Sequence, residues 1–398
     1  MNAKERFQAV MNFEPCDRTL DWEFSYWAGV VKRWYDEGLP KKEGIPVNLQ
    51  HADIVHGPGL YWPANMGSGG VAASSPLDKD IANYFNFDKG IRRIPLNIWM
   101  EPDMEAQTIS EDDRTITLKD AWGITMKVSK ITTSPPEYID WPVKNRNDWE
   151  NLKERCFHND IEKRLPSNWP ELVKEFKNRD YPLMFGGYPC GYYGALRHLM
   201  GDVGLSLMFY DDPELVKDIQ SFLTDLWIRL YDVVLKEIVP DWCLLWEDMA
   251  YNSDSMISPA SFKEFLSPYY KRLTDFLKSK GVKNIFVDSD GNCWKLIPLW
   301  IEAGITGQYP MEVTAGMDIV KMRREYPKYR VMGGLDKKEI AKGKTAIDKL
   351  LSIVPDMIKQ GGYVPFLDHT THEDISWENF KYYREQVTKI IYSTKVLS

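Results

Sequence analysis

Short apolar runs recur along the second half of this chain, and each one ends in glycines or in residues that can carry chemistry. They are about four to eight residues long, which is the length of a buried strand. They lie at 183–188, 242–248, 282–288, 305–310, 331–336 and 362–369. The pattern predicts a series of buried strands.

Amphipathic segments with helix-start signals lie between these runs. Asp212-Pro213 is a capping residue followed by proline at the first helical position, and apolar residues then recur every three or four positions through Leu226. Ser258-Pro259 repeats the signal, and Gly281 is expected to end that helix. Helical spacing also predicts a helix over 293–303.

This alternation of strands and helices favours a parallel sheet built from βαβ units. Residues with chemistry follow the strands rather than precede them, which is the polarity of a (β/α)8 barrel. We therefore expect a TIM barrel, and not a doubly wound sheet. No Pro/Gly/Ser-rich linker divides the chain, so the prediction is a single domain over residues 1–398 with an N-terminal extension.

One insertion interrupts the pattern at about 108–131. Polar and β-branched residues alternate there on both sides of a turn at 120–123, which predicts an antiparallel hairpin. The hairpin could cap the barrel mouth, meet a partner or serve only as a supporting flap.

Composition narrows the class of protein. The 398 residues exceed the roughly 250 of a barrel, which leaves room for the extension and the insertion. The net charge of −8 argues against a nucleic-acid surface. No apolar run reaches the roughly 18 residues of a membrane span, and the N-terminus lacks a signal-peptide core. Five cysteines without a CxxC pair are typical of a reducing compartment, so we expect a cytoplasmic protein.

Asp288 and Asp290 form the most informative candidate site. They end the run at 282–288, and their side chains point the same way because neighbours on a strand alternate faces. Such a pair is costly unless it binds a metal, a cation or a substrate proton. We expect both to be catalytic. The competing interpretation is that they cap the helix expected at 293–303.

Further candidates end neighbouring runs. Glu247 and Asp248 follow one strand, Glu312 follows another, and Asp368 and His369 end the last. We expect Glu247 and His369 to be catalytic and Asp248 and Asp368 to bind substrate. The alternatives are an ion pair with a barrel arginine for Glu247 or Asp248, and a solvated loop position for Glu312.

Aromatic residues suggest how a substrate is held. Trp22, Phe24, Tyr26 and Trp27 cluster near the N-terminus, and Tyr188 ends the run at 183–188. Such rings can stack on an aryl group or surround a methylated cation. We expect Trp22, Tyr26 and Tyr188 to contact substrate, with plain core packing as the alternative for each.

The motifs as a set resemble the uroporphyrinogen decarboxylase superfamily of TIM barrels. The resemblance spans nearly the whole chain. It is carried by the opening at 4–18, by Trp246-Glu-Asp-Met249, by Ile257-Ser-Pro259, by Asp288-Ser-Asp-Gly-Asn292, by Gly333-Gly-Leu-Asp-Lys337 and by Gly361-Gly-Tyr-Val-Pro365.

Departures from the family patterns indicate a branch. The true decarboxylase has an Arg-Gln-Ala-Gly-Arg segment near its N-terminus, whereas the corresponding residues 21–29 contain two acids and no arginine. Two acids there are expected to repel a porphyrinogen that carries eight carboxylates. The thiol-activating methyltransferases have a His-x-Cys-Gly-Asn zinc loop, which reads Asp288-Ser-Asp-Gly-Asn292 here.

The resemblance therefore implies an enzyme that takes a methyl group from a methyl ether or similar donor and passes it to the cobalt of a separate corrinoid protein, as anaerobes do. The leaving oxygen needs a Lewis acid or a general acid. Asp288, Asp290, Glu312 and His369 could hold zinc, or His369 or a carboxylate could supply the proton. The alternatives are a decarboxylase of porphyrin biosynthesis and a non-catalytic binding protein on the same fold.

Overall fold

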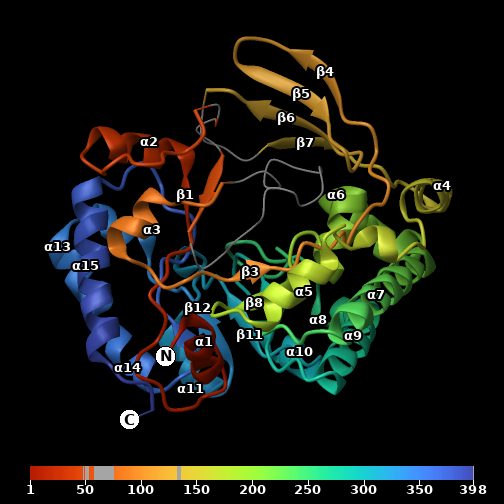
Figure 1. Ribbon diagram of the computed structural model, residues 1–398. Helices are drawn as coiled ribbons and strands as arrows, with labels where there is room; N and C mark the ends of the chain where they lie inside the picture. The colour runs from red at the N-terminus through yellow and green to blue at the C-terminus, as the bar shows by residue number, and fades with distance from the viewer. Residues whose placement is uncertain (48, 50–52, 58–75, 132–135, 398) are drawn as a thin grey trace.

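The computed structural model describes residues 1–47, 49, 53–57, 76–131 and 136–397. Its centre is a curled parallel sheet in the order β13-β12-β11-β10-β9-β8-β3 (Figure 1). The strands are β3 (Arg92–Arg93), β8 (Leu183–Gly186), β9 (Trp242–Trp246), β10 (Ile285–Asp288), β11 (Gly307–Tyr309), β12 (Arg330–Met332) and β13 (Tyr363–Val364). Strand alternates with helix along this sheet, so the predicted TIM-barrel fold is confirmed.

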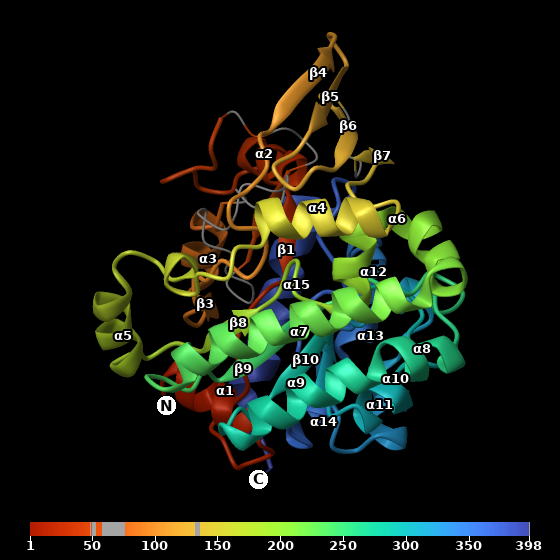
Figure 2. The ribbon, with the colours of Figure 1, turned by 90° about the vertical axis from the view of Figure 1, so that its right-hand side faces the viewer.

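Helices surround the sheet on its outer side (Figures 1 and 2). Those that follow the strands are α6 (Tyr192–Asp211), α7 (Pro213–Leu235), α8 (Pro259–Phe265), α9 (Ser267–Ser279), α10 (Ile297–Glu302), α11 (Ile319–Glu325), α12 (Lys337–Ala341), α13 (Lys344–Leu351), α14 (Val354–Lys359) and α15 (Trp377–Ser393). The earlier ones are α1 (Ala3–Met11), α2 (Ala28–Asp36), α3 (Asp80–Phe85), α4 (Arg146–Cys156) and α5 (Trp169–Lys177). No helix in the described part of the chain is long and apolar enough to cross a membrane.

The N-terminal extension joins the two edges of the sheet. The Thr19 hydroxyl donates to the Tyr363 carbonyl of β13 at 2.7 Å, and the Asp88 amide donates to the Asp21 carbonyl at 3.2 Å just ahead of β3. The chain then forms β1 (Ser25–Trp27), which pairs with β2 (Ile54–His56). The extension therefore contributes to closing the barrel.

Local sequence signals predicted the starts of α7 and α8, but they did not predict the break that divides the second helix. Asp212 caps α7 by accepting from the Leu215 amide, as expected. Ser258 caps α8, but the expected helix through Gly281 is split after Leu266, because α9 has a proline near its start and proline lacks the N–H that would continue the first helix.

The helix expected over 293–303 was predicted too early. Residues 293–296 form turns, and α10 begins only at Ile297. Its start is therefore well separated in the chain from Asp288 and Asp290. No hydrogen bond from α10 to either aspartate is present, so the capping interpretation of these acids is wrong.

The insertion is larger than the predicted hairpin. The hairpin itself is confirmed as β5 (Thr115–Lys119) and β6 (Thr125–Ser129), and β4 (Gln107–Glu111) and β7 (Glu137–Asp140) extend it to a four-stranded antiparallel sheet. This insertion sheet rises from one end of the barrel (Figure 2). Trp122, in the turn between β5 and β6, is buried and packs on Tyr188, which follows β8. The insertion therefore contacts the mouth of the barrel.

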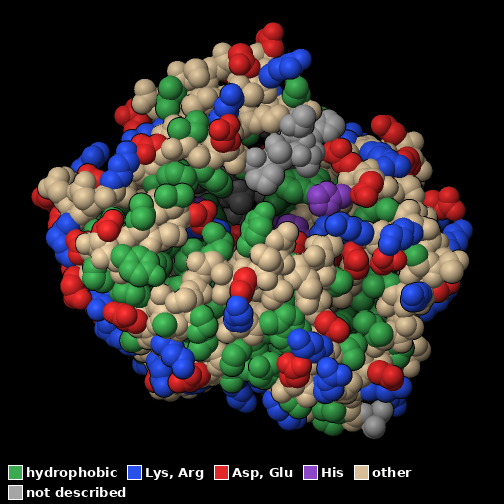
Figure 3. Space-filling view, turned by 180° about the vertical axis from the view of Figure 1, so that it is seen from behind, with side chains coloured by type: hydrophobic (Ala, Val, Ile, Leu, Met, Phe, Trp, Pro, Cys, Tyr) green, Lys and Arg blue, Asp and Glu red, His purple; other side chains and the backbone are tan. Residues whose placement is uncertain are grey.

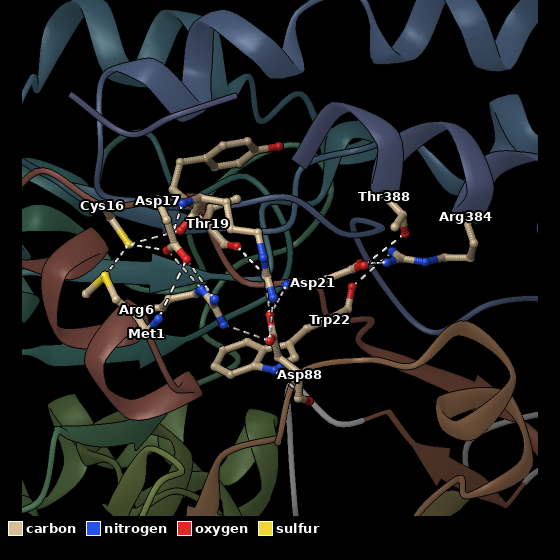
Figure 4. Close-up of polar contacts among 12 residues, drawn as sticks. Met1, Arg6, Cys16, Asp17, Thr19, Asp21, Trp22, Asp88, Arg384 and Thr388 are labelled. Carbon is tan, nitrogen blue, oxygen red and sulfur yellow. Dashed lines mark hydrogen bonds and ion pairs between the residues drawn. The ribbon is translucent and has the colours of Figure 1, made fainter. Parts of the chain in front are cut away.

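The two acids of segment 21–29 belong to a buried ionic network, of which Figure 4 shows Asp21, Arg384 and Thr388. Arg384 of α15 pairs with Asp21 and with Glu23, and all three residues are fully buried. Thr388 donates to Asp21 at 2.9 Å, and Tyr383 donates to Glu23 at 3.0 Å. These acids do not line the barrel mouth, so the expected repulsion of an anionic substrate by them is wrong.

Candidate functional site

The carboxyl ends of the strands bring the predicted acids together. Asp288 ends β10 and pairs in register with Trp246 of β9 and Tyr309 of β11. Asp290 follows two residues later, and its Oδ2 lies 3.1 Å from His369 Nε2, beyond β13. Asp248, beyond β9, interacts electrostatically with both aspartates. Four of the predicted residues therefore share one site.

Asp290 and His369 form an ion pair. Burial alone would lower the pKa of His369, but the Asp290 carboxylate outweighs it and the pKa is raised. Burial likewise opposes ionisation of Asp290, yet His369 and Lys337 bring its pKa below the usual value. The other oxygen, Asp290 Oδ1, is buried without a hydrogen-bond partner among the described residues. That oxygen can accept a hydrogen bond from a substrate.

Asp248 is held by Arg197 of α6. The Arg197 guanidinium lies 3.2 Å from Asp248 Oδ2 and also donates to the Asp248 carbonyl at 2.8 Å. Burial and the nearby Asp290 raise the pKa of Asp248 to about 6 against the effect of Arg197. Asp248 also has a φ of 43°, a conformation that a non-glycine residue adopts only when its surroundings impose it.

Asp288 differs from Asp248, Asp290 and Asp368 because no cation pairs with it in the described part of the chain. Its only side-chain partner there is the Tyr309 hydroxyl, which donates to Oδ2 at 3.3 Å. Burial, followed by the charges of Asp248 and Asp290, raises its pKa well above the ordinary range. These effects favour the neutral carboxylic acid form of Asp288, and in that form it can donate a proton.

Asp368 is not available to a substrate, which corrects the prediction. It is fully buried and accepts from the backbone amides of Val313 and Lys337 at 3.0 and 3.1 Å. The Lys337 ammonium lies 3.6 Å from its Oδ1. Asp368 thus fixes the loops that follow β11 and β12.

Glu247 is also a positioning residue rather than a catalytic one. Its carboxylate is fully buried and accepts from the amides of Tyr192, Tyr193 and Gly194 at the start of α6, and from the Tyr270 hydroxyl. The amides of a first helical turn have no partner within the helix, so a carboxylate there completes them. Glu247 therefore anchors α6, the helix that carries Arg197.

The four predicted metal ligands do not converge. Glu312 Oε2 accepts from the Gly291 amide at 2.9 Å and so braces the loop of Asp290. Asp290 hydrogen-bonds to His369, and Asp288 accepts from the Tyr309 hydroxyl. No group of three or more His, Cys, Asp or Glu side chains within the described ranges could hold a metal ion. The arrangement does not fit zinc, and we derive no step through it.

Two of the predicted aromatic contacts are wrong. Trp22 is fully buried and donates to the Asp88 carbonyl, and Tyr26 is buried against Trp34 and Phe380. Only Ser25–Trp27 of this segment is strand, so strand alternation does not set the directions of Trp22 and Phe24. Phe24, from the same cluster, is the one that reaches the site, with its ring centre 5.7 Å from that of His369.

Tyr188 lies where the sequence predicted, within an aromatic wall. Its ring packs on Trp246 at 4.8 Å, on Trp122 at 5.2 Å and on His198 at 4.9 Å between centres. The Arg197 guanidinium lies 4.9 Å from the centre of the Trp246 ring. The wall therefore joins the insertion sheet to Asp248 through Arg197. Its contact with a substrate stays a prediction.

Sequence reasoning missed Arg197, Lys337 and Tyr309. Tyr309 ends a predicted strand, so its position was a usable signal. Lys337 directly follows the acid that ends another run, whereas Arg197 lies inside a helix and gives no local signal. Their functional roles stay inferences from the geometry.

These cations change the charge of the site. Arg197 pairs with Asp248, His369 with Asp290 and Lys337 with Asp368, and the raised pKa of Asp288 favours its neutral form. The acidic cluster seen in the sequence is therefore nearly balanced. The surface seen from behind has a hollow below the insertion sheet, with hydrophobic and histidine side chains near it (Figure 3).

Comparisons with known proteins agree with this architecture. The family model described as Uroporphyrinogen decarboxylase (URO-D) matches residues 117–390, well over half of the chain. A solved structure, a methyltransferase from Methanosarcina mazei, is similar over 98% of this chain and 100% of that chain, with a TM-score of 0.58 and 14% sequence identity. At that identity the likeness supports the fold alone. No curated protein matches the chain. The resemblance drawn from the motifs is confirmed at the level of the family: the chain belongs to the uroporphyrinogen decarboxylase (URO-D) family.

Proposed function

We propose that this protein is a methyltransferase that takes a methyl group from an O-methyl donor and delivers it to the cobalt of a separate corrinoid protein. The observation that carries the proposal is the environment of Asp288, which ends β10 without a paired cation among the described residues and accepts from the Tyr309 hydroxyl, while burial and the charges of Asp248 and Asp290 raise its pKa. A proton donor is what a poor leaving group such as an alkoxide or phenoxide requires.

The fold is compatible with this choice of reaction, because a methyltransferase from Methanosarcina mazei has a similar structure, and the choice itself rests on the site. The acid site supports the donor class. Thiols need a soft zinc site for activation, whereas an ether oxygen needs a proton. Asp288 and Asp290 stand where a thiol-activating enzyme has the His and Cys ligands of its zinc loop, and the raised pKa of Asp288 favours a form that can give a proton.

The chemistry balances with the groups present. The bond between the methyl carbon and the ether oxygen breaks, its electron pair stays on oxygen, and the Asp288 carboxyl gives that oxygen its proton. The reduced cobalt of the corrinoid partner supplies the electron pair for the new bond to the methyl carbon. Asp288 then regains a proton from solvent, which completes the cycle.

Neighbouring groups keep Asp288 protonated and oriented. The negative charges of Asp290 and Asp248 oppose ionisation of Asp288, and the Tyr309 hydroxyl fixes its Oδ2. His369 keeps Asp290 ionised, and Arg197 holds Asp248 in place. General acid catalysis of this kind contributes about 10²- to 10⁴-fold to a rate.

A methyl-transfer assay tests the proposal. The purified protein is mixed with cob(I)alamin and a panel of aryl and alkyl methyl ethers, and methylcobalamin is followed by its absorbance with and without a chelator. We expect formation that survives the chelator. Formation that disappears with it would favour the zinc hypothesis over acid catalysis.

Two other outcomes would overturn the proposal. No methylcobalamin from any donor, together with carbon dioxide release from uroporphyrinogen, would identify a decarboxylase. Silence in both assays, with a competent reduced cobalt centre, would favour a binding protein on the same fold.

A further inference from the structure

Lys337 is the cation of the site with the least satisfied charge. Its side chain is only 6% exposed, and its ammonium lies 3.6 Å from Asp368 Oδ1, beyond hydrogen-bond distance. The ammonium makes no hydrogen bond to any residue that the structure describes, although it has three N–H donors. A nearly buried charge without hydrogen bonds is costly, so the ammonium is poised for an acceptor that the described residues do not supply.

The partner carboxylate cannot satisfy Lys337 by itself. Asp368 already accepts from the amides of Val313 and Lys337, and its backbone is fixed by the bond from its amide to the Leu335 carbonyl at 2.8 Å. Asp368 is therefore held in place by the barrel. The described residues offer the ammonium no additional acceptor.

Open space lies next to Lys337. A cavity of about 300 Å³ is bordered by α12 and by the loop between β13 and α15. Its lining residues are Lys337, Lys338, His372, Glu373, Asp374 and Ile375. The two acids of the lining lie on the more exposed loop, where water screens their charge, whereas the Lys337 ammonium is nearly buried.

Lys337 also borders the acid site. Its charge acts on Asp290 and on His369, as well as on His372 of the cavity lining. The ring of Trp27 lies 6.2 Å from that of His372, so an aromatic side chain is close to the same cavity. Lys337 therefore stands between the cavity and the carboxyl groups proposed to do the chemistry.

We propose that Lys337 binds a carboxylate of the methyl donor, so that the donor is a methoxylated carboxylic acid. The inference rests on the proposed function and adds its substrate class. A carboxylate oxygen supplies the missing acceptor for the ammonium, and an anion is admitted because Asp248 and Asp290 are already paired with cations. Bound there, the acid group anchors the donor while the ether end extends toward Asp288.

Binding to the protein alone tests this proposal without cobalamin. Isothermal titration compares 4-methoxybenzoate with 4-methoxybenzyl alcohol, which has the same ether and no charge. A charge-assisted hydrogen bond predicts that the wild type binds the carboxylate roughly 10- to 100-fold more tightly than the alcohol. Lys337→Met removes that preference, so that the variant no longer binds the carboxylate more tightly than the alcohol.

Matched variants separate a direct contact from general effects. Lys342→Met removes a charge at the end of the same helix, where the side chain is 60% exposed and paired with Glu339, and it leaves the preference intact. Because Lys337→Met alone leaves Asp368 buried without its cation, the double variant Lys337→Met with Asp368→Asn removes both charges. It loses the preference as well, and circular dichroism checks that each variant is folded.

The outcomes for the two proposals are distinguishable. Equal binding of the two ligands by the wild type, or a preference that persists in folded variants without Lys337, overturns the anion site. Methyl transfer from neutral ethers with no preference for acids would overturn the anion site while leaving the proposed function intact. Tight carboxylate binding that depends on Lys337, without methyl transfer from any donor, would support the site and overturn the proposed function.

Discussion

Two clusters of acids and cations in this protein have the same residue types but differ in how completely their polar atoms are paired. In the network around Arg384, every carboxylate oxygen of Asp21 and Glu23 has a partner, and the residues are fully buried. In the site at the strand ends, Asp290 Oδ1 and the Lys337 ammonium lack hydrogen bonds among the described residues, and Asp288 has no cation. The scaffold network therefore satisfies its carboxylate oxygens, although Arg384 Nε lacks a hydrogen bond among the described residues, whereas the site leaves a carboxylate oxygen and an ammonium without one.

The largest effect is expected when the site loses its proton donor. Asp288→Asn keeps the shape but cannot release a proton, so the rate of methylcobalamin formation should fall about 10²- to 10⁴-fold. The wild-type rate should also fall as pH rises through the elevated pKa of Asp288, because only the protonated form acts. Initial rates across pH measure both.

The stability of the Asp288→Asn variant should not fall with its activity. Asp288→Asn removes a carboxyl group that no cation compensates, so the urea midpoint should stay the same or rise. Asp356→Asn, whose side chain is 80% exposed beside Lys359, serves as the control and should leave the rate unchanged. An Asp288→Asn enzyme with nearly full activity would contradict the proton-donor role.

The network around Arg384 should show the reverse pattern. Arg384→Met leaves Asp21 and Glu23 buried without their cation, which should cost about 3–5 kcal/mol of unfolding free energy. Urea denaturation measures the loss. The matched control is Arg272→Met, which breaks an exposed pair with Asp225 and should cost about 0–1 kcal/mol. Equal costs for the two variants would refute the distinction between the buried and exposed pairs.

Glu247 provides a test that depends on pH. Burial raises its pKa from 4.5 to about 7, so between these values the native state keeps a proton that the unfolded chain has lost. Its contribution is therefore fully present below about pH 4.5 and falls by about 3 kcal/mol as pH rises to about 7. Glu247→Gln cannot titrate, so the difference in unfolding free energy between wild type and variant should change by that amount. If the unfolding free energies of the wild type and the variant ran parallel from about pH 4.5 to about pH 8, that result would contradict the raised pKa of Glu247.

The smallest effect is expected at the exposed edge of the Arg384 region. Asp17 pairs with Arg6 at 2.7 Å, but its side chain is 45% exposed. The hydrogen bond from Arg6 lowers the pKa of Asp17, so the contribution is present near neutral pH and is lost as pH falls toward that low value. Because water screens the pair, Asp17→Asn should cost about 0–1 kcal/mol. Urea denaturation at low and high salt would reveal a larger coupling if one exists.

Local patterns predicted the barrel well because a buried strand needs a continuous apolar run. The runs ending near Tyr188, Asp248 and Asp288 became β8, β9 and β10, each in the expected order. The two-residue β3 consists of Arg92 and Arg93, so it carries no apolar signal at all. Strands β4 and β7 of the insertion were missed because every residue in them is exposed and no buried face imposes a pattern.

The candidate site was predicted in part for a similar reason. Asp288, Asp290, Asp248 and His369 meet because parallel strands place their carboxyl ends on one face. Glu247 looked equivalent to Asp248 in the sequence, but one carboxylate is covered by the start of α6 and its neighbour is not. A sequence does not record which of two adjacent acids a distant helix will cover.

By itself, the sequence determined the kind of fold, the polarity of the barrel and the strand ends where acids gather, because these depend on spacing and burial within short segments. Only the tertiary structure decided which acids are neutral, paired or structural. Arg197, Lys337 and Arg384 come from helices far along the chain, and their charges act through space over a few ångströms. The protonation of Asp288 follows from that arrangement of charges and from burial, and neither is a property of Asp288 as a residue.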